Sequence, residues 1–303
     1  AAFMKSRSHL AFAGYLGKQY DPFICDKAAV LPVYTNVGRD TGQVSGGDIF
    51  QMPRGLNQDR LHDRLSLLQQ FDVLKAGRDQ DGSMDALGAY QRQAVDLLLG
   101  DRARAAFDLN REDPVVRARY GNHLWCQQAL IARRLVEAGT AFVTLDLSYH
   151  TASGTWDTHG DNIPPYGGIW NGLRPLLPVF DHLITTLVSD LGERGLLDDV
   201  LVLAMGEFGR TPQIGTQGST DGRNHWPVVM SMTVAGGGMR HGQIIGATER
   251  DAGQIKERPV TPGDLAATIF HHMQVPRDVT YLDNRGRPRN VIENGQAIHE
   301  LIA

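Results

Sequence analysis

The sequence predicts an α/β protein with a doubly wound, mostly parallel sheet that is flanked by helices. One observation behind this prediction is that apolar, strand-like runs alternate with helical patterns in the second half of the chain. The other is that polar segments rich in potential metal-binding side chains lie next to these runs. Open α/β sheets place their chemistry in this position, at the carboxyl ends of their strands.

The first half of the chain is predicted to be mainly helical. Apolar residues recur at helical spacing within residues 56–75, at Leu61, Leu65, Leu68 and Phe71. Residues 84–100 form a second helical candidate, and Asp113-Pro114 is a typical helix start, with an N-cap acid before a proline. A helix over 122–138 is expected to end at Gly139.

The second half is predicted to build the sheet. Strands are expected over residues 141–147, 200–205 and 228–235, the last one closed by three glycines. A helix over 172–194 is expected to stop near Gly195, and a helix from Thr261 to about His272 has threonine as its N-cap. We therefore predict one domain over 1–303, in which 56–138 is a helical insertion or cover and 140–303 is the sheet core.

Composition excludes some classes of partner. The chain has 303 residues, of which 42% are hydrophobic and 21% charged, and its formal net charge is −4. This charge gives no general attraction to nucleic acid or to an anionic membrane. No apolar run reaches the ~18 residues of a membrane span. The two cysteines, Cys25 and Cys126, can pair or stay free, and their spacing does not decide between these states.

A seven-residue segment, Trp156 to Asn162, carries the densest set of candidate ligands. Asp157 and His159 are two residues apart in an expected loop after the strand at 141–147, so both can face one ion. The alternative is a capping aspartate beside a histidine that hydrogen-bonds to backbone, and this segment alone does not separate the two readings.

Two later segments repeat the pattern. Glu207 follows the strand at 200–205, where a carboxylate can be a metal ligand, a general base or a helix cap. His225 precedes the strand at 228–235, and a single histidine there can equally be structural. Arg210 and Arg223 suit a tetrahedral anion, since guanidinium forks match sulfate or phosphate oxygens, although Glu207 and Arg210 can also form an ordinary salt bridge.

Six segments together resemble the DUF1501 family, a family of unknown function that is rich in planctomycetes and related to the alkaline phosphatase and sulfatase superfamily. The resemblance covers most of residues 140–303, with matching segments in the same order. The segments are Trp156–Asn162, Gly206–Pro212, Gly222–Pro227, Ala235–Met239, Gly246–Thr248 and Asp264–Ile269.

The resemblance implies an alkaline phosphatase-like fold with a divalent metal centre. Asp157 and His159 resemble the first ligand pair of the superfamily, Glu207 an acidic ligand, and His225 the last histidine. Two departures weaken the implied chemistry. Phe208 stands where the superfamily usually has a histidine, and the sulfatase nucleophile signature, Cys or Ser followed by x-Pro-x-Arg, is absent. The nucleophile is unidentified, and we expect that an N-terminal portion carrying it, with the first strands, is missing from this chain.

The sequence thus favours a metal-dependent hydrolase of sulfate or phosphate esters. Zinc, calcium or magnesium would be held by Asp157, His159, Glu207 and His225, and a small anionic ester or sulfated glycan would be contacted by further polar residues. Those residues are Arg210, Arg223, Asn162 and His150. The alternative is a non-catalytic, anion- or glycan-binding protein of the same fold. The resemblance also implies twin-arginine export and a periplasmic or secreted location.

Overall fold

The computed structural model describes residues 12–17, 20–23, 59, 60, 63, 66, 67, 101–147, 156–160 and 168–302. The chain divides into two compact units, one of residues 1–32 and 40–147 and one of residues 33–39 and 148–303. The described residues form both helices and strands, as expected, so the protein is α/β in the broad sense. The expected single domain over 1–303 stays a prediction.

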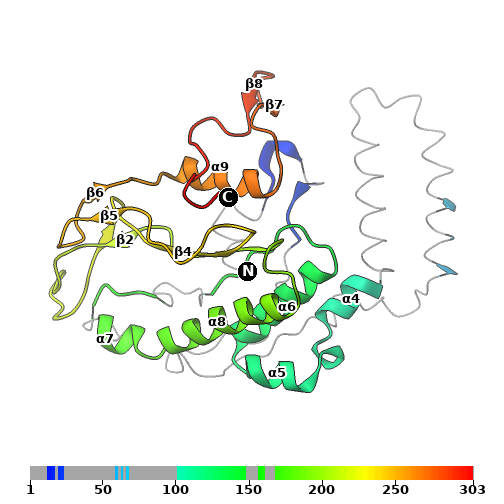
Figure 1. Cartoon of the computed structure of the whole chain (residues 1–303), viewed down its shortest axis with the longest axis horizontal. Helices are drawn as coiled ribbons and strands as arrows, with labels where there is room; N and C mark the ends of the chain where they lie inside the picture. Colours follow the sequence, from blue (N-terminus) through cyan, green and yellow to red (C-terminus); the bar gives the residue numbers. More distant parts are fainter. Residues whose placement is uncertain are drawn as a thin grey trace. The chain divides into compact units, whose positions relative to one another are not determined.

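The described part of the first unit is helical (Figure 1). Its elements are α4 (Asp101–Phe107), η7 (Leu109–Arg111), α5 (Pro114–Tyr120) and α6 (Leu124–Glu137), after a short η2 (Gly14–Leu16). The helix start at Asp113 is confirmed, because its carboxylate accepts a hydrogen bond from Val115 N at 2.7 Å. Gly139, just beyond α6, has a φ of 99°, which suits a glycine at a helix end.

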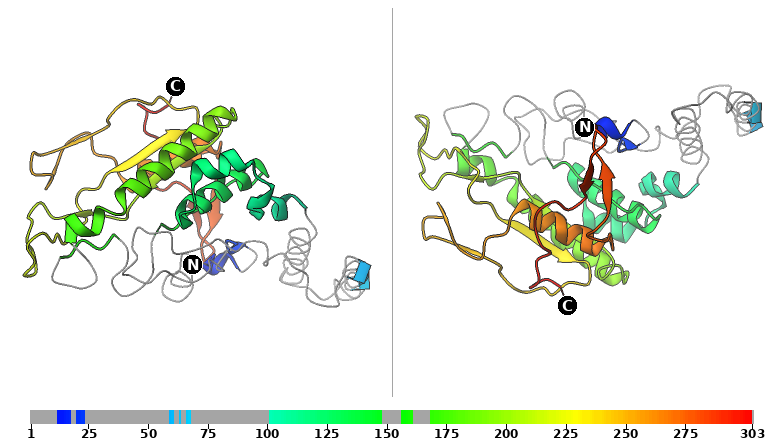
Figure 2. Two further views of the ribbon diagram at one scale, coloured as in Figure 1. Left: turned by 90° about the horizontal axis from the view of Figure 1, so that it is seen from below. Right: turned by 90° about the horizontal axis from the view of Figure 1, so that it is seen from above.

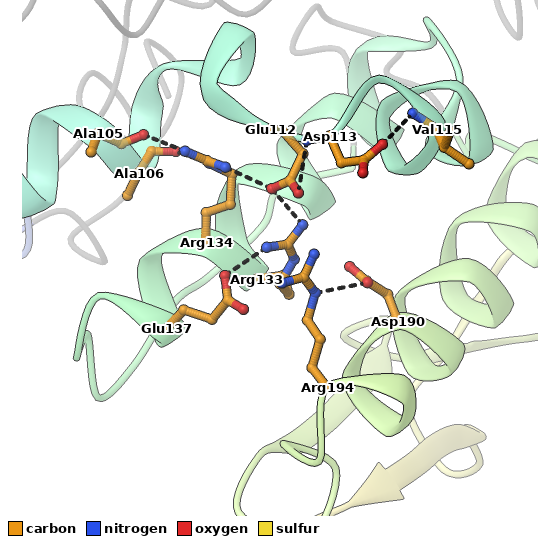
Figure 3. A network of polar contacts seen from close by, with 10 residues as sticks. All are labelled: Ala105, Ala106, Glu112, Asp113, Val115, Arg133, Arg134, Glu137, Asp190 and Arg194. Atoms are coloured by element: carbon orange, nitrogen blue, oxygen red, sulfur yellow. Dashed lines mark hydrogen bonds and ion pairs between the residues drawn. The ribbon is translucent and has the colours of Figure 1, made fainter.

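A buried ion cluster joins the helices of this unit (Figure 3). One oxygen of Glu112 accepts from Arg133 at 2.7 Å and from Arg134 at 2.6 Å, and Arg133 also reaches Glu137 at 2.6 Å. The side chains of Arg133 and Glu112 are only 1% and 6% exposed, so these charges depend on one another for solvation. Burial opposes ionisation of Glu112, but the hydrogen bonds and charges of the two arginines prevail and lower its pKa.

The second unit contains helices and short antiparallel strand pairs. Its helices are α7 (Gly168–Leu173), α8 (Leu177–Glu193) and α9 (Pro262–His272), and its strands are β1 (Leu201–Met205), β2 (Gly209–Arg210), β3 (His225–Trp226), β4 (Met232–Gly236), β5 (Ala247–Thr248), β6 (Ile255–Glu257), β7 (Thr280–Leu282) and β8 (Pro288–Asn290). In Figures 1 and 2, α8 and α9 lie on opposite sides of the ribbon that β1 and β4 form. This layering agrees with an apolar strand pair that is covered on both faces.

The four described strand pairs are all antiparallel, which differs from the expected mostly parallel sheet. The register of β1 and β4 runs from Leu201 opposite Gly236 to Met205 opposite Met232. No crossover helix joins these two strands, since the connection over 206–231 instead carries the β2–β3 pair. Both ends of the connection over 206–231 therefore lie at the same end of the β1–β4 ribbon, and the β2–β3 pair holds its two halves together.

Three expected elements also differ from the structure. Residues 141–147 form no strand, because a strand needs a partner ladder and no described segment pairs with them. The helix expected over 172–194 is divided into α7 and α8, since Pro175 and Pro178 cannot donate to a continuous helix. The last strand begins at Met232 rather than residue 228.

Other predictions in this unit are confirmed. The strand at 200–205 is β1, and α8 ends before Gly195, whose φ is 67°. Thr261 and Asp264 form the reciprocal capping box expected for α9. Among the described residues, no helix combines the length and apolar character needed to span a membrane.

Candidate functional site

Three motif segments meet in the second unit, at the end of the ribbon where the connection between β1 and β4 begins and ends. β2 and β3 place Arg210 directly opposite His225. The pairing continues past the strands, because Thr211 N donates to Asn224 O at 2.9 Å. The first motif joins this hairpin through Arg223 N, which donates to Thr158 O at 2.8 Å. The local ladder therefore brings residues 156–160 against residues 207–211 and 222–226.

Gly222 permits this close approach. A Cβ atom at this position would lie 1.9 Å from His159 O and 2.2 Å from the hydroxyl of Ser219. These atoms cannot move apart easily, because Ser219 Oγ accepts from Gly222 N at 2.8 Å and the neighbouring Arg223 N is bonded to Thr158 O. The glycine in this motif is thus required by packing between two backbones.

Asp157 orients the imidazole of His159. One carboxylate oxygen of Asp157 accepts from His159 N at 2.9 Å and lies 2.7 Å from His159 Nδ1. The other ring nitrogen, Nε2, lies 3.5 Å from Nη1 of Arg210. Arginine can only donate, so both contacts select the same tautomer, with the proton on Nδ1 and a lone pair on Nε2.

A second imidazole stands beside the first. The ring centroids of His159 and His225 are 4.7 Å apart, and His225 also packs on Phe208 with a centroid distance of 4.2 Å. Desolvation and then the positive charge of Arg210 lower the pKa of His225, against the opposing charge of Glu207. His225 is therefore held towards its neutral form, which is the form that binds metals.

Glu207 completes the set of titratable groups at this end of the ribbon. Its carboxylate is exposed and acts on both Arg210 and His225 through its charge. Phe208, which stands where a histidine was expected from the family resemblance, instead supplies an aromatic face under His225. Sequence reasoning treated this phenylalanine only as a missing ligand and overlooked its packing role.

The two arginines differ in what they contact. Arg223 is committed to backbone carbonyls, with Nε bonded to Thr211 O at 2.5 Å and Nη2 to Arg210 O at 2.9 Å. Arg210 donates from Nη1 to Arg223 O at 3.2 Å and from Nη2 to Trp156 O at 3.4 Å. Each arginine thus bonds to the main chain of the other, and together they fasten the three motifs.

Asp221 is a structural residue of the site that sequence reasoning missed. It is buried, and one carboxylate oxygen accepts from Trp170 N at 3.2 Å, in the first turn of α7. Gly168 makes room for it, because a Cβ there would lie 1.8 Å from the other oxygen. In the sequence, Asp221 stands directly before the motif glycine in Thr220-Asp221-Gly222, and this position could have marked it as part of the site.

The structure brings together Asp157, His159, His225 and Arg210, with Glu207 close enough to act on them electrostatically. Asn162 and His150 lie outside the described residues. Within the described ranges, no three histidine, cysteine or acidic side chains are grouped so that they could hold one ion. Asp157 already uses an oxygen on His159, which places it behind the imidazole rather than beside it as a separate ligand.

Comparison with known proteins identifies the family. A model of the family described as "Protein of unknown function (DUF1501)" matches residues 3–302. No curated protein and no solved structure matches the chain. The family model spans both units and all three motif segments, so the chain belongs to the DUF1501 family.

Proposed function

We propose that this protein hydrolyses sulfate or phosphate esters with the help of a divalent metal bound at the two-imidazole site. The observation that carries the proposal is the pairing of His159, oriented by Asp157, with the neighbouring ring of His225. A histidine that ligates a metal typically donates its other ring nitrogen to a carboxylate in this way. The site also holds a guanidinium, which is the group that recognises sulfate and phosphate oxygens best.

The donor types fit a metal centre of mixed character. Imidazole nitrogens such as those of His159 and His225 are ligands that zinc prefers, and the exposed carboxylate of Glu207 is proposed as a third ligand. Asp157 serves in this proposal as the carboxylate behind His159. A bound divalent ion would supply a Lewis acid for the ester oxygen and activate water. Calcium or magnesium would depend more on oxygen donors, to which Asn162 would contribute.

The remaining polar residues receive roles in substrate binding. Arg210 would contact the sulfate or phosphate group, and Arg223 would hold the backbone of Arg210 in place. His150 and Asn162 are proposed as further contacts to a small anionic ester or sulfated glycan. This arrangement belongs to the larger proposal that the chain is related to the alkaline phosphatase and sulfatase superfamily, with its doubly wound sheet and its exported location.

Metal binding and turnover test the proposal separately. We expect the full chain to bind about one or two zinc ions per molecule, as expected for such centres, and to hydrolyse 4-nitrophenyl sulfate or 4-nitrophenyl phosphate. His159→Gln and His225→Gln should lose both properties, whereas Asp181→Asn, on the exposed face of α8, should keep them. A chain that binds neither zinc, calcium nor magnesium, with no hydrolysis of either ester, would refute the proposal.

A second candidate function is non-catalytic anion binding by the same fold. It is favoured by the 3.5 Å contact between Arg210 Nη1 and His159 Nε2, which puts a cation where a metal would bind. Sulfate binding that needs Arg210 but no metal, without any ester hydrolysis, would select this candidate. Turnover that is lost in Glu207→Gln would exclude it.

A further inference from the structure

Arg210 and Arg223 are held with different firmness. The two bonds of Arg223 to carbonyl oxygens, at 2.5 and 2.9 Å, are as short as ordinary N–H···O bonds or shorter. The three contacts of the Arg210 guanidinium, at 3.2, 3.4 and 3.5 Å, are all longer than the usual length of about 2.9–3.0 Å. Both arginines fasten the motifs, but the longer contacts of Arg210 make its guanidinium the more readily displaced of the two.

The loosely held guanidinium stands in front of one particular atom. His159 donates a hydrogen bond from Nδ1–H to Asp157, so the only ring lone pair is on Nε2, and Arg210 Nη1 faces that lone pair. A metal ion bound to His159 needs the same lone pair, because Nδ1 is engaged. Arg210 in this position therefore opposes a cation at His159 both by occupying the lone pair and by its charge.

We propose that Arg210 guards His159, so that an oxyanion and a divalent cation bind to this site cooperatively. A sulfate or phosphate group draws the guanidinium away from Nε2 and thereby exposes the lone pair to the metal. This inference rests on the proposed function, because it takes His159 as a metal ligand and Arg210 as the contact to the anion.

The energetics of exchange favour this motion. A sulfate offers the guanidinium two short, charge-assisted bonds in place of three long ones. The anion also reduces the repulsion between the guanidinium and the incoming cation.

The backbone need not move with the side chain. Arg223 Nη2 holds Arg210 O, and the pairing of Arg210 with His225 fixes the same residue from the opposite strand. The ring of Phe208 already lies 6.0 Å from Arg210 Cζ, within cation–π range, so an aromatic face borders the guanidinium. The motion is thus a change of side-chain rotamer on a fixed strand pair.

Zinc affinity with and without sulfate tests the linkage. The full chain is titrated with zinc against a chromophoric chelator, in sodium sulfate or in sodium chloride of the same ionic strength. We expect sulfate to tighten zinc binding by roughly 5-fold or more, the lower end of typical couplings between sites. Arg210→Gln should bind zinc tightly in chloride and show no response to sulfate.

Two further variants complete the experiment. Arg277→Gln, which removes an exposed guanidinium bonded to Gly295 O, should respond to sulfate like the wild type. Arg210→Lys keeps the charge without the planar fork, so its response should be reduced, and it replaces Arg210→Gln if that variant does not fold.

The outcomes separate this inference from the proposed function. Zinc binding of equal strength in both salts overturns the guarding role and leaves the metal site intact. A full sulfate response in Arg210→Gln also overturns it, because the anion would then act elsewhere. Absence of zinc binding in either salt overturns the metal site itself and the guarding role with it.

Discussion

At the scale of single residues, the contact between Asp157 and His159 determines what the imidazole can do. The carboxylate fixes the proton on Nδ1 and directs Nε2 towards Arg210, which leaves one defined lone pair at the site. His225 lies in a different setting, because its ring packs against the rings of His159 and Phe208 and its lowered pKa favours the neutral form.

Replacing Asp157 with asparagine should therefore change the tautomer of His159. The amide can turn its NH2 group towards the ring, which favours the proton on Nε2 and blocks the lone pair. We expect a larger fraction of the Nε2–H tautomer in nitrogen NMR spectra of the imidazole. We also expect zinc affinity to fall roughly 10–100-fold, as for other carboxylates behind a ligating histidine.

Asp181→Asn is the matched control for this change. Asp181 is exposed on α8, and its side chain contacts neither imidazole in the described structure, so the tautomer should stay as in the wild type. An unchanged His159 tautomer in Asp157→Asn would contradict the orienting role.

At the scale of secondary structure elements, the helices of the first unit are joined through one carboxylate. Glu112 lies between η7 and α5 and bonds to two arginines of α6. Glu112→Gln keeps the shape of the side chain but removes the one carboxylate that bonds to both Arg133 and Arg134. The free energy of unfolding should fall by roughly 3–5 kcal/mol, the usual cost of breaking a buried ion pair.

The effect of Glu112→Gln should also depend on pH. The folded pKa of Glu112 is lowered, so its stabilisation is complete above the unfolded pKa of about 4.3 and is lost as the pH falls through the folded pKa. Urea unfolding at several pH values should show the difference between variant and wild type shrinking below about pH 4.

Glu137→Gln provides the comparison for this cluster. The carboxylate of Glu137 bonds to the same Arg133 but its side chain is 32% exposed, and Glu112 remains to compensate the guanidinium. The cost should stay below about 1 kcal/mol. Equal losses in the two variants would contradict the central role of Glu112.

The capping box of α9 gives a second prediction at this scale. Thr261 Oγ1 accepts from Asp264 N at 3.1 Å, and Asp264 accepts from Thr261 N at 2.8 Å. Thr261→Ala should lower the free energy of unfolding by about 1 kcal/mol, as for other lost N-caps. Thr185→Ala, which removes a hydroxyl bonded within α8, should cost less than about 0.5 kcal/mol, and a reversed order would refute the capping role.

At the scale of the whole molecule, ligand binding in one unit can be separated from stability in the other. The site residues lie in the second unit, whereas Glu112 and its arginines lie in the first. In a constant concentration of sulfate, zinc at about 100 times its Kd should raise the free energy of unfolding by about 2.7 kcal/mol if it binds only the folded chain. This increase should persist in Glu112→Gln and disappear in His159→Gln, as measured by denaturant unfolding.

Loss of the increase in Glu112→Gln would show that the site depends on the ion cluster. Persistence of the increase in His159→Gln would show that the ligands stabilise the chain at another place. The first result would contradict the separation of ligand binding from the stability of the first unit, and the second would contradict the assignment of binding to the three motif segments.

The sequence by itself determined the features that depend on neighbouring residues. The caps at Asp113 and Thr261, the end of α8 before Gly195 and the strand at Leu201–Met205 follow from local hydrogen bonding and apolar pattern. The division between α7 and α8 also has a cause in the sequence, because Pro175 and Pro178 interrupt the helical hydrogen bonds. The prediction of one helix over 172–194 followed the apolar pattern and did not use these prolines.

Only the tertiary structure decided how the strands pair and what each motif residue contacts. An apolar run reads alike in a parallel and in an antiparallel pair, so the antiparallel β1–β4 ribbon and the lack of a strand at 141–147 were not visible in the sequence. The same holds for the site. The sequence motifs identified Asp157, His159, Arg210 and His225 as candidates. They could not show whether Arg210 binds an anion or faces an imidazole, because its position depends on contacts between segments more than fifty residues apart.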